Sequence, residues 1–484
     1  MLDVLAVALP LAVIFGILGR LFWPGYFSQD SVQQLTQAIG LAPLEDAHPV
    51  SMALLMRFFT DTDSGFLGYF AFQLSLVVIL VCAVTMIAFR WLLPPLPRFR
   101  RGSMSAFAVA IALLPPSGLL NLVVWKDVPA TWLLTTQAFA VAAFAQAMID
   151  RLYTLRTFSF LLIVALLSGA AAVHFRHNAF LVAYTLMGVL ALFAGHDLWT
   201  TNQDVIKKLT VVAAGAVLLV GIIHTRHWLR EAFIEDSRNR AAGVEEFDAR
   251  TWVVKSDFWM AYHLGLPLSP QQDARLNELV DVERQSARFS PYNSFHQKTG
   301  EYRNSSPEME PLFIRFATDT LAAHPWHWLK AKAFYTVQLV NSIGGLQVPP
   351  PNRRHQLVGQ FDINMDARFR GARTMFRTMM GREQALRYHG LIFWTFWPVV
   401  LAFVLGTALV VWAHLERVST LGRLVVTAIP VVAALSLSLP LVLFSSPNDY
   451  RYFWGNWYFA VLFCLLILKN YRDGIALLWS RRIR

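Results

Sequence analysis

PGYFSQDSVQQ, residues 24–34, is the stretch around which the rest of this chain is organised. It follows directly on an apolar run, residues 2–22, and it opens a segment whose apolar residues recur on one helical face. Its only carboxylate, Asp30, is therefore expected just outside a first membrane-spanning helix. There the carboxylate would lie at the mouth of any cavity that the later helices enclose.

Composition predicts an all-α polytopic membrane protein. Of the 484 residues 56% are hydrophobic, and the mean hydropathy is +0.44. Long apolar runs recur, and a helix needs about 20 apolar residues to cross a bilayer. The first run has neither a basic n-region nor an Ala-x-Ala exit, so it is expected to be retained. About ten transmembrane helices are predicted, at 2–22, 66–89, 104–120, 130–149, 158–175, 179–194, 209–223, 391–415, 424–444 and 457–468.

The net charge of +11 is explained by membrane topology, and no nucleic acid is expected as a partner. Fourteen of the 42 basic residues lie in short loops or at the C-terminal tail, as the positive-inside rule predicts for cytoplasmic segments. Both termini are therefore expected in the cytoplasm. These basic residues are Arg98, Arg100, Arg101, Arg151, Arg156, Lys207, Lys208, Arg417, Arg423, Lys469, Arg472, Arg481, Arg482 and Arg484.

Three regions follow from this pattern. Residues 1–223 are predicted to form an N-terminal transmembrane module whose first external loop, 23–65, carries two short amphipathic helices at 31–39 and 50–59. Residues 224–390 hold no spanning segment and are expected to form a mainly helical soluble domain on the outer face. Within it, 319–340 is predicted to be one amphipathic helix near the bilayer. Residues 391–484 form the C-terminal transmembrane module and tail.

Polar and charged residues gather at the outer helix ends in this topology. A charged group at a helix mouth is costly unless it is paired or lines a wet cavity, so these residues predict a shared site. The candidate site residues are Asp30, His48, Lys126, Asp127, Arg176, Asn178, Asp449 and Arg451, with Asn448 beside the last two.

Several of these residues also have ordinary structural interpretations. Asp30 with Gln33 fits a capping box. Lys126 and Asp127 are compatible with a local surface ion pair, which would stabilise little. Arg176 is compatible with an interaction with headgroup phosphates.

The other candidates have structural alternatives as well. His48 stands before Pro49, where it would simply begin the second amphipathic helix, and Arg451 lies among aromatic residues typical of an interfacial anchor. The acids of Asp61-Thr-Asp63 resemble a divalent-metal pair, but Asp63-Ser-Gly65 is also ordinary turn chemistry. No cofactor is required by these patterns, and a divalent metal is left open.

An external acid beside external cations suits transfer from a lipid-phosphate donor. The carboxylate would act as general base on an acceptor hydroxyl, while Lys and Arg side chains would hold the phosphate and stabilise the leaving oxyanion. Nucleotide sugars are cytoplasmic, on the wrong side of the membrane for this site. A polyprenyl-phosphate sugar is therefore the expected donor.

The motifs resemble those of the GT-C glycosyltransferase superfamily. Residues 25–34 followed by Asp46-Ala-His48-Pro49 are similar to the first external loop of bacterial GT-C-like proteins. Trp125-Lys126-Asp127, Arg176-His177-Asn178 and Asp449-Tyr450-Arg451-Tyr452 are similar to their later signatures. The resemblance covers the transmembrane frame and implies that Asp30 is the catalytic base. The chain departs from the family in having no clear Asp-x-Asp or Glu-x-Asp beside Asp30 and in carrying its soluble domain internally.

The resulting hypothesis is an inverting glycosyltransferase of a bacterial cytoplasmic membrane, with its active site on the periplasmic face. It would transfer a sugar to a glycan, lipid or envelope-polymer acceptor. Lys126, Arg176 and Arg451 would bind phosphate, and His48 and Asn178 would orient substrate. Two alternatives stay open, an O-antigen polymerase or ligase that uses loop Arg and His residues, and a transporter or flippase of lipid-linked substrates. Transporters place ionisable groups near the bilayer midplane, and the predicted spans are nearly free of acids.

Overall fold

A computed structural model of the chain is all-helical in the part that it describes, with no β-strand there. The described residues are 2–21, 29–40, 50–60, 67–93, 100–113, 121–122, 124, 126–150, 154–176, 179–200, 249–288, 309–341, 397–416, 420–444 and 454–482, with a few isolated positions. The long apolar helices among them indicate a multi-pass membrane protein.

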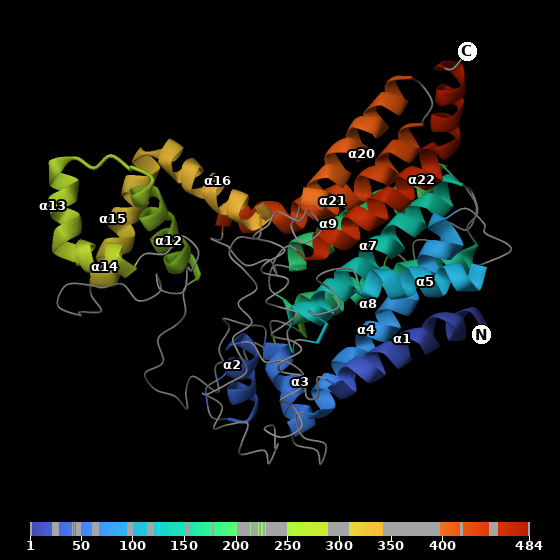
Figure 1. The fold of residues 1–484 in the computed structure, drawn as a ribbon, viewed down its shortest axis with the longest axis horizontal. Coiled ribbons are helices and arrows are strands. Elements are labelled where there is room, and N and C mark those ends of the chain that lie inside the picture. The colour runs from blue at the N-terminus through green and yellow to red at the C-terminus, as the bar shows by residue number, and fades with distance from the viewer. Residues whose placement is uncertain are drawn as a thin grey trace.

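Nine of the described helices form the membrane bundle (Figure 1). They are α1 (Leu2–Leu21), α4 (Leu67–Ile87), α5 (Arg100–Leu113), α7 (Asp127–Ile149), α8 (Leu155–Phe175), α9 (Ala179–Thr200), α20 (Trp397–Leu415), α21 (Leu421–Phe444) and α22 (Gly455–Arg482), and α4 continues into a π-helical turn, η1 (Ala88–Leu92). Their outward faces are apolar, with exposed side chains such as Leu9 and Leu405, as expected for lipid contact.

Six helices of the described part are long and apolar enough to cross a membrane, fewer than the ten that the sequence predicts. They are α1, α4 with η1, α7, α8, α20 and α21. The predicted span 104–120 corresponds to α5, which has 14 residues and ends at Leu113. The predicted span 209–223 lies almost wholly outside the described residues.

Helix α7 is the centre of the bundle and is buried along almost its whole length. It packs against α4, α8, α9, α21 and α22. Its Gln137 donates a hydrogen bond from Nε2 to the Ala183 carbonyl at 3.1 Å. A Cβ atom at Gly169 of α8 would come within 2.2 Å of the same Nε2. Small residues that permit close approach, with an amide linking neighbouring helices, are typical of packing within a membrane.

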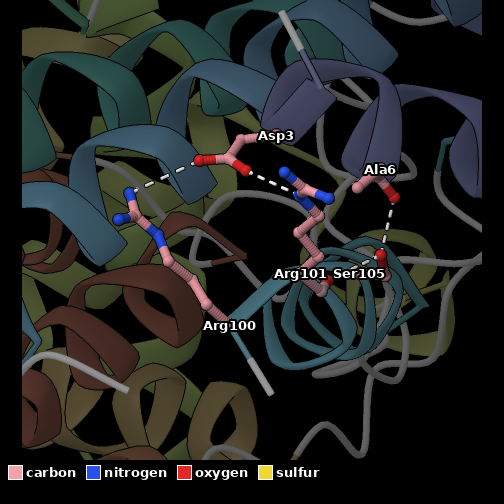
Figure 2. A network of polar contacts seen from close by, with 5 residues as sticks. All are labelled: Asp3, Ala6, Arg100, Arg101 and Ser105. Atoms are coloured by element: carbon pink, nitrogen blue, oxygen red, sulfur yellow. Dashed lines mark hydrogen bonds and ion pairs between the residues drawn. The ribbon is translucent and has the colours of Figure 1, made fainter. Parts of the chain in front are cut away.

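Charged residues link α1 to α5 at one end of the bundle. Asp3 of α1 forms ion pairs with Arg100 at 3.6 Å and Arg101 at 3.1 Å, and Ser105 Oγ donates to the Ala6 carbonyl at 2.6 Å (Figure 2). Both termini lie toward the end of the bundle away from α2 (Gln29–Ala38) and α3 (Val50–Thr60) in Figure 1. The basic residues that begin α5 thus lie at one end of the bundle, and the two amphipathic helices lie at the other.

The two short helices of the first loop confirm the predicted amphipathic segments at 31–39 and 50–59. Helix α2 packs against α3, and α3 packs against α4 and α8. The buried residues of α2 are Ser31, Gln34, Leu35, Gln37 and Ala38, most of which recur at helical spacing.

A separate group of helices, called here the α12–α16 group, has its own hydrophobic core. It comprises α12 (Ala249–His263), α13 (Pro270–Leu279), α14 (Val282–Arg288), α15 (Met309–Ala323) and α16 (Pro325–Asn341). Its core is built around Phe258, Trp259, Phe313 and Tyr335. It meets the bundle where α16 contacts α21 (Figure 1).

The prediction of one helix over 319–340 is wrong. Helix α15 ends at Ala323 and α16 begins at Pro325. Proline has no backbone N–H, and it disfavours helical conformation in the residue before it. The helix is therefore interrupted at His324. Pro325 then occupies the first position of α16, where the missing N–H costs nothing.

Candidate functional site

The centre of the candidate site is a buried ion pair between two helix ends. Arg176 is the C-cap of α8, and Asp127 is the first residue of α7. Arg176 Nη1 lies 3.2 Å from Asp127 Oδ1, and the side chains are only 7% and 2% exposed. A carboxylate is favoured at a helix N-terminus and a cation at a helix C-terminus, so both backbones support this pair. The interpretation of Lys126 and Asp127 as a local surface ion pair is therefore wrong, and Arg176 has a protein carboxylate as a partner.

Lys126 adds a second buried cation beside this pair. It is the N-cap residue of α7, directly before Asp127, and its side chain is buried. Lys126 and Arg176 carry two positive charges and Asp127 one negative charge, so these three side chains together have a net positive charge. Lysine and arginine side chains are the usual protein ligands of phosphate, so these two cations make this end of the bundle a candidate site for an anionic ligand.

Helix α2 is attached to this cluster at its first turn. Ser31 Oγ donates a hydrogen bond to the Val124 carbonyl, two residues before Lys126. The attachment brings the backbone of Asp30 to the same end of the bundle as Lys126. Because α2 begins at Gln29, Asp30 lies inside the helix instead of at the N-cap position that the capping-box interpretation requires. The side chain of Asp30 is outside the described part of the structure.

Helix α3 is attached to the same cluster through α8. Ser51 Oγ lies 3.4 Å from Nδ1 of His174, in the last turn of α8 and two residues before Arg176. Both amphipathic helices of the first loop are therefore held next to the Asp127–Arg176 pair. His174 and Ser51 were not among the residues predicted for the site.

Asn121 anchors the segment that leads into Lys126. Its side chain is fully buried, accepts a hydrogen bond from Trp132 Nε1 at 2.9 Å and donates one to the Ala112 carbonyl at 3.2 Å. Its own carbonyl accepts from Gln73 Nε2 at 3.1 Å. Bonds to α4, α5 and α7 thus position the chain immediately before the cations. Sequence reasoning missed this residue, because its partners are distant in the chain.

Gln34 is a further site residue that the sequence reasoning missed. It follows Asp30 by one helical turn, so the two residues share a side of α2. Its side chain is 1% exposed, and within the described residues neither the amide nitrogen nor the amide oxygen has a hydrogen-bond partner. An unsatisfied buried polar group costs about 1–3 kcal/mol, which a bound hydroxyl group would recover. The signal was present in the sequence as an amide four positions after the proposed base.

The other predicted site residues are not described by the structure. His48, Asn178, Asp449 and Arg451 lie outside the described residues, as do the acids Asp61 and Asp63. Within the described part of the chain, no group of three or more His, Cys, Asp or Glu residues is arranged to hold a metal ion. Of the predicted site residues, the structure therefore describes the side chains of Lys126, Asp127 and Arg176, and it attaches α2 near them through Ser31.

Comparisons with protein-family models, with curated proteins and with solved structures each find no match. Function must therefore be inferred from the geometry of this site and from its motifs.

Proposed function

We propose that this protein is a membrane glycosyltransferase of the GT-C type that transfers a sugar from a polyprenyl-phosphate donor to a glycan, lipid or envelope-polymer acceptor. We place it in a bacterial cytoplasmic membrane with this site on the periplasmic face. The observation that carries the proposal is the buried Asp127–Arg176 pair with Lys126 beside it, at the end of the bundle to which α2 is attached.

Charge supports a phosphate as the group bound at the cluster. A guanidinium carries five N–H donors in a planar fork, and Asp127 contacts it through Nη1. The geometry is thus compatible with a carboxylate and a phosphate oxygen held by the same side chain. In this role Asp127 is a positioning residue, because it acts on the donor through Arg176.

The proposed reaction is a single displacement at the anomeric carbon of the donor. An acceptor hydroxyl oxygen bonds to that carbon, and the bond from the same carbon to the phosphate oxygen breaks. Asp30 takes the hydroxyl proton, and polyprenyl phosphate leaves with the bonding electron pair. Arg176 and Lys126 stabilise the negative charge that grows on the departing phosphate.

The buried amide of Gln34 fits the same reaction as a binding group for a sugar hydroxyl. An amide offers both a donor and an acceptor, and a hydroxyl can use both. Because Gln34 shares a side of α2 with Asp30, a sugar bound by its amide would lie beside the proposed base. The lipid tail would remain in the membrane beside α3, whose Phe58 is exposed.

The test uses the purified full chain in lipid nanodiscs with a panel of polyprenyl-phosphate hexoses and pentoses. The measured quantity is the rate at which polyprenyl phosphate is released in the presence of envelope glycan acceptors. We expect Asp30→Asn to lower this rate by about 10²–10⁴-fold, the usual contribution of a general base. The matched control is Asp150→Asn, whose carboxylate lies at the other end of α7 and 3.4 Å from Lys469 Nζ.

Two outcomes would overturn the proposal. Full activity of Asp30→Asn would favour the polymerase or ligase alternative, in which loop Arg and His residues carry the chemistry. Uptake of a lipid-linked substrate into proteoliposomes without any sugar transfer would favour the transporter. Mass analysis of envelope glycans from cells with and without the gene identifies the sugar and the acceptor.

A further inference from the structure

One face of α16 is exposed and largely apolar. Trp326, Leu329 and Val337 are 65%, 45% and 57% exposed, and Lys330 and Ala333 are exposed beside them. At 100° per residue these five side chains fall within a stripe about 100° wide, which is the width of an amphipathic face. We call these five residues the outer face of α16.

The opposite face fixes how the helix is oriented. Lys332 Nζ lies 2.8 Å from Asp257 Oδ2, and the same oxygen accepts a hydrogen bond from Trp328 Nε1 at 2.9 Å. Tyr335 donates a hydrogen bond from its hydroxyl to the Ser256 carbonyl at 3.1 Å. These contacts hold the inner face of α16 against α12, so the helix cannot rotate to bury its outer face within the group.

The position of α16 brings the outer face close to the membrane. The helix contacts α21, one of the helices that are long and apolar enough to cross a bilayer. In Figure 1 it runs from α12 and α15 to the bundle as the connection between the two parts. Its 17 residues span about 25 Å, so the outer face is a strip of that length that begins at the bundle and leads away from it.

We propose that the outer face of α16 lies on the surface of the bilayer and thereby holds the α12–α16 group against the membrane. Trp326, Leu329 and Val337 enter the boundary between headgroups and acyl chains, where Trp is favoured. Lys330 stands at one edge of the stripe, where its ammonium group reaches the lipid phosphates while its stem lies over the apolar surface.

Composition favours lipid over a second protein surface as the occupant. The outer face carries one lysine at its edge, and no acidic residue occurs anywhere along α16 that anionic headgroups would repel. A protein partner would have to supply a fitted apolar pocket for Trp326 and an acid opposite Lys330. A bilayer supplies an apolar layer and phosphates at every position. Contact with α21 places α16 beside a helix that is long and apolar enough to cross the bilayer.

The test places a fluorescent probe on the outer face in the full-length protein. The two free cysteines, Cys82 and Cys464, are replaced by Ser, and Leu329→Cys is labelled with an environment-sensitive dye. The matched control carries the dye at Glu278→Cys on α13, an exposed position of the same group. Both proteins are reconstituted in vesicles of phosphatidylcholine with phosphatidylglycerol. We expect nitroxide-labelled lipid to quench the probe at 329 several-fold more than the control, and iodide in the buffer to quench it several-fold less.

The outcomes separate lipid from the other occupants. A probe at 329 quenched by iodide as strongly as the control would show a solvent-exposed face and overturn the proposal. A probe shielded from both quenchers would show a protein cover, such as a second copy of the chain, and would also overturn it. Because the readout is independent of sugar transfer, it stands or fails separately from the proposed enzyme.

A charge reversal tests the part assigned to Lys330. We expect Lys330→Glu to reduce lipid quenching of the probe at 329 more strongly in vesicles that contain phosphatidylglycerol than in pure phosphatidylcholine, because the new carboxylate is repelled by anionic headgroups. An equal reduction in the two kinds of vesicle would overturn the role of this charge. The apolar residues of the outer face would then account for the whole of the binding.

Discussion

The pair Asp127–Arg176 at the end of the bundle and the pair Asp257–Lys332 in the α12–α16 group are both buried, yet they occupy opposite settings. Asp127 and Arg176 lie at helix termini, each at the end whose dipole favours its charge. Asp257 and Lys332 lie in the interiors of α12 and α16, where no such support exists. Burial of an ion pair is therefore not by itself evidence of a site.

The pKa shifts of Asp257 and Lys332 show that burying this pair is costly. Burial raises the pKa of the Asp257 carboxyl even though the Lys332 ammonium and the Trp328 indole act in the opposite direction. Burial also lowers the pKa of Lys332. In the described structure, Asp257 Oδ1 and the hydroxyl of Ser256 have no hydrogen-bond partner. The pair thus joins two helices at a considerable desolvation cost.

The largest expected effect comes from breaking the structural pair. Lys332→Met leaves the Asp257 carboxylate buried without its cation, and we expect a loss of about 3–5 kcal/mol of local stability. The measurement is hydrogen exchange of the α12 and α16 amides by mass spectrometry in nanodiscs. Adding Asp257→Asn to Lys332→Met should restore most of the protection. If the double variant were as unstable as the single one, lost packing of the lysine stem would be the cause.

Changing the bundle pair should have the opposite signature. Arg176→Lys keeps a positive charge for Asp127 but removes the planar fork that would hold a phosphate as well. We expect the rate of polyprenyl phosphate release to fall by about 10²–10³-fold, as when one donor of an oxyanion site is lost. Hydrogen exchange across α7 and α8 should change little. Loss of protection with unchanged turnover would make this pair as structural as Asp257–Lys332.

The contrast also marks what the sequence was able to predict. Apolar periodicity located α2 and α3, and the position of Arg176 at an expected outer helix end marked it as a candidate site residue. The spacing of apolar residues along the chain is enough to locate such helices. It does not contain the partner of Arg176, because the contact with Asp127 depends on how α7 packs against α8. The sequence suggested an ion pair between the neighbours Lys126 and Asp127, whereas the tertiary structure pairs Asp127 with Arg176.

Lys332 was hidden for a related reason. It follows Lys330 by two residues, which places it about 200° around the helix and on the opposite face. Spacing thus separates the two lysines, but only the packing of α16 on α12 shows that the face with Lys332 is the buried one and that its partner is Asp257. The break at Pro325, by contrast, was visible in the sequence and was overridden by the continuous amphipathic pattern around it. At this position the effect of Pro325 on the preceding residue decides where the helix ends, and the apolar periodicity does not.

A smaller effect, on pH, sharpens the contrast further. In Lys332→Met, Asp257 loses the cation that lowered its pKa, so the folded form should favour the protonated carboxyl still more. A raised folded pKa gives stability that is present below the unfolded value of about 3.9 and is lost as pH rises through the folded value. We therefore expect Lys332→Met to lose protection relative to the double variant as pH rises, by at most about 1.4 kcal/mol per pH unit. Exchange rates corrected for pH and measured from about pH 4.5 to 7.5 would show it, and parallel profiles would contradict it.

The smallest expected effect compares two buried groups that have no hydrogen-bond partner in the described residues, Gln34 in the site and Ser256 in the α12–α16 group. Replacing either by an apolar residue, Gln34→Met or Ser256→Ala, removes a desolvation cost and should stabilise its own region by about 1 kcal/mol. The variants should differ in function. Gln34→Met should lower turnover about fivefold, because a hydrogen bond of about 1 kcal/mol to the sugar is lost, whereas Ser256→Ala should leave turnover unchanged. Equal turnover in both variants would mean that the amide of Gln34 contacts no substrate, and that its isolation is a defect of packing like that of Ser256.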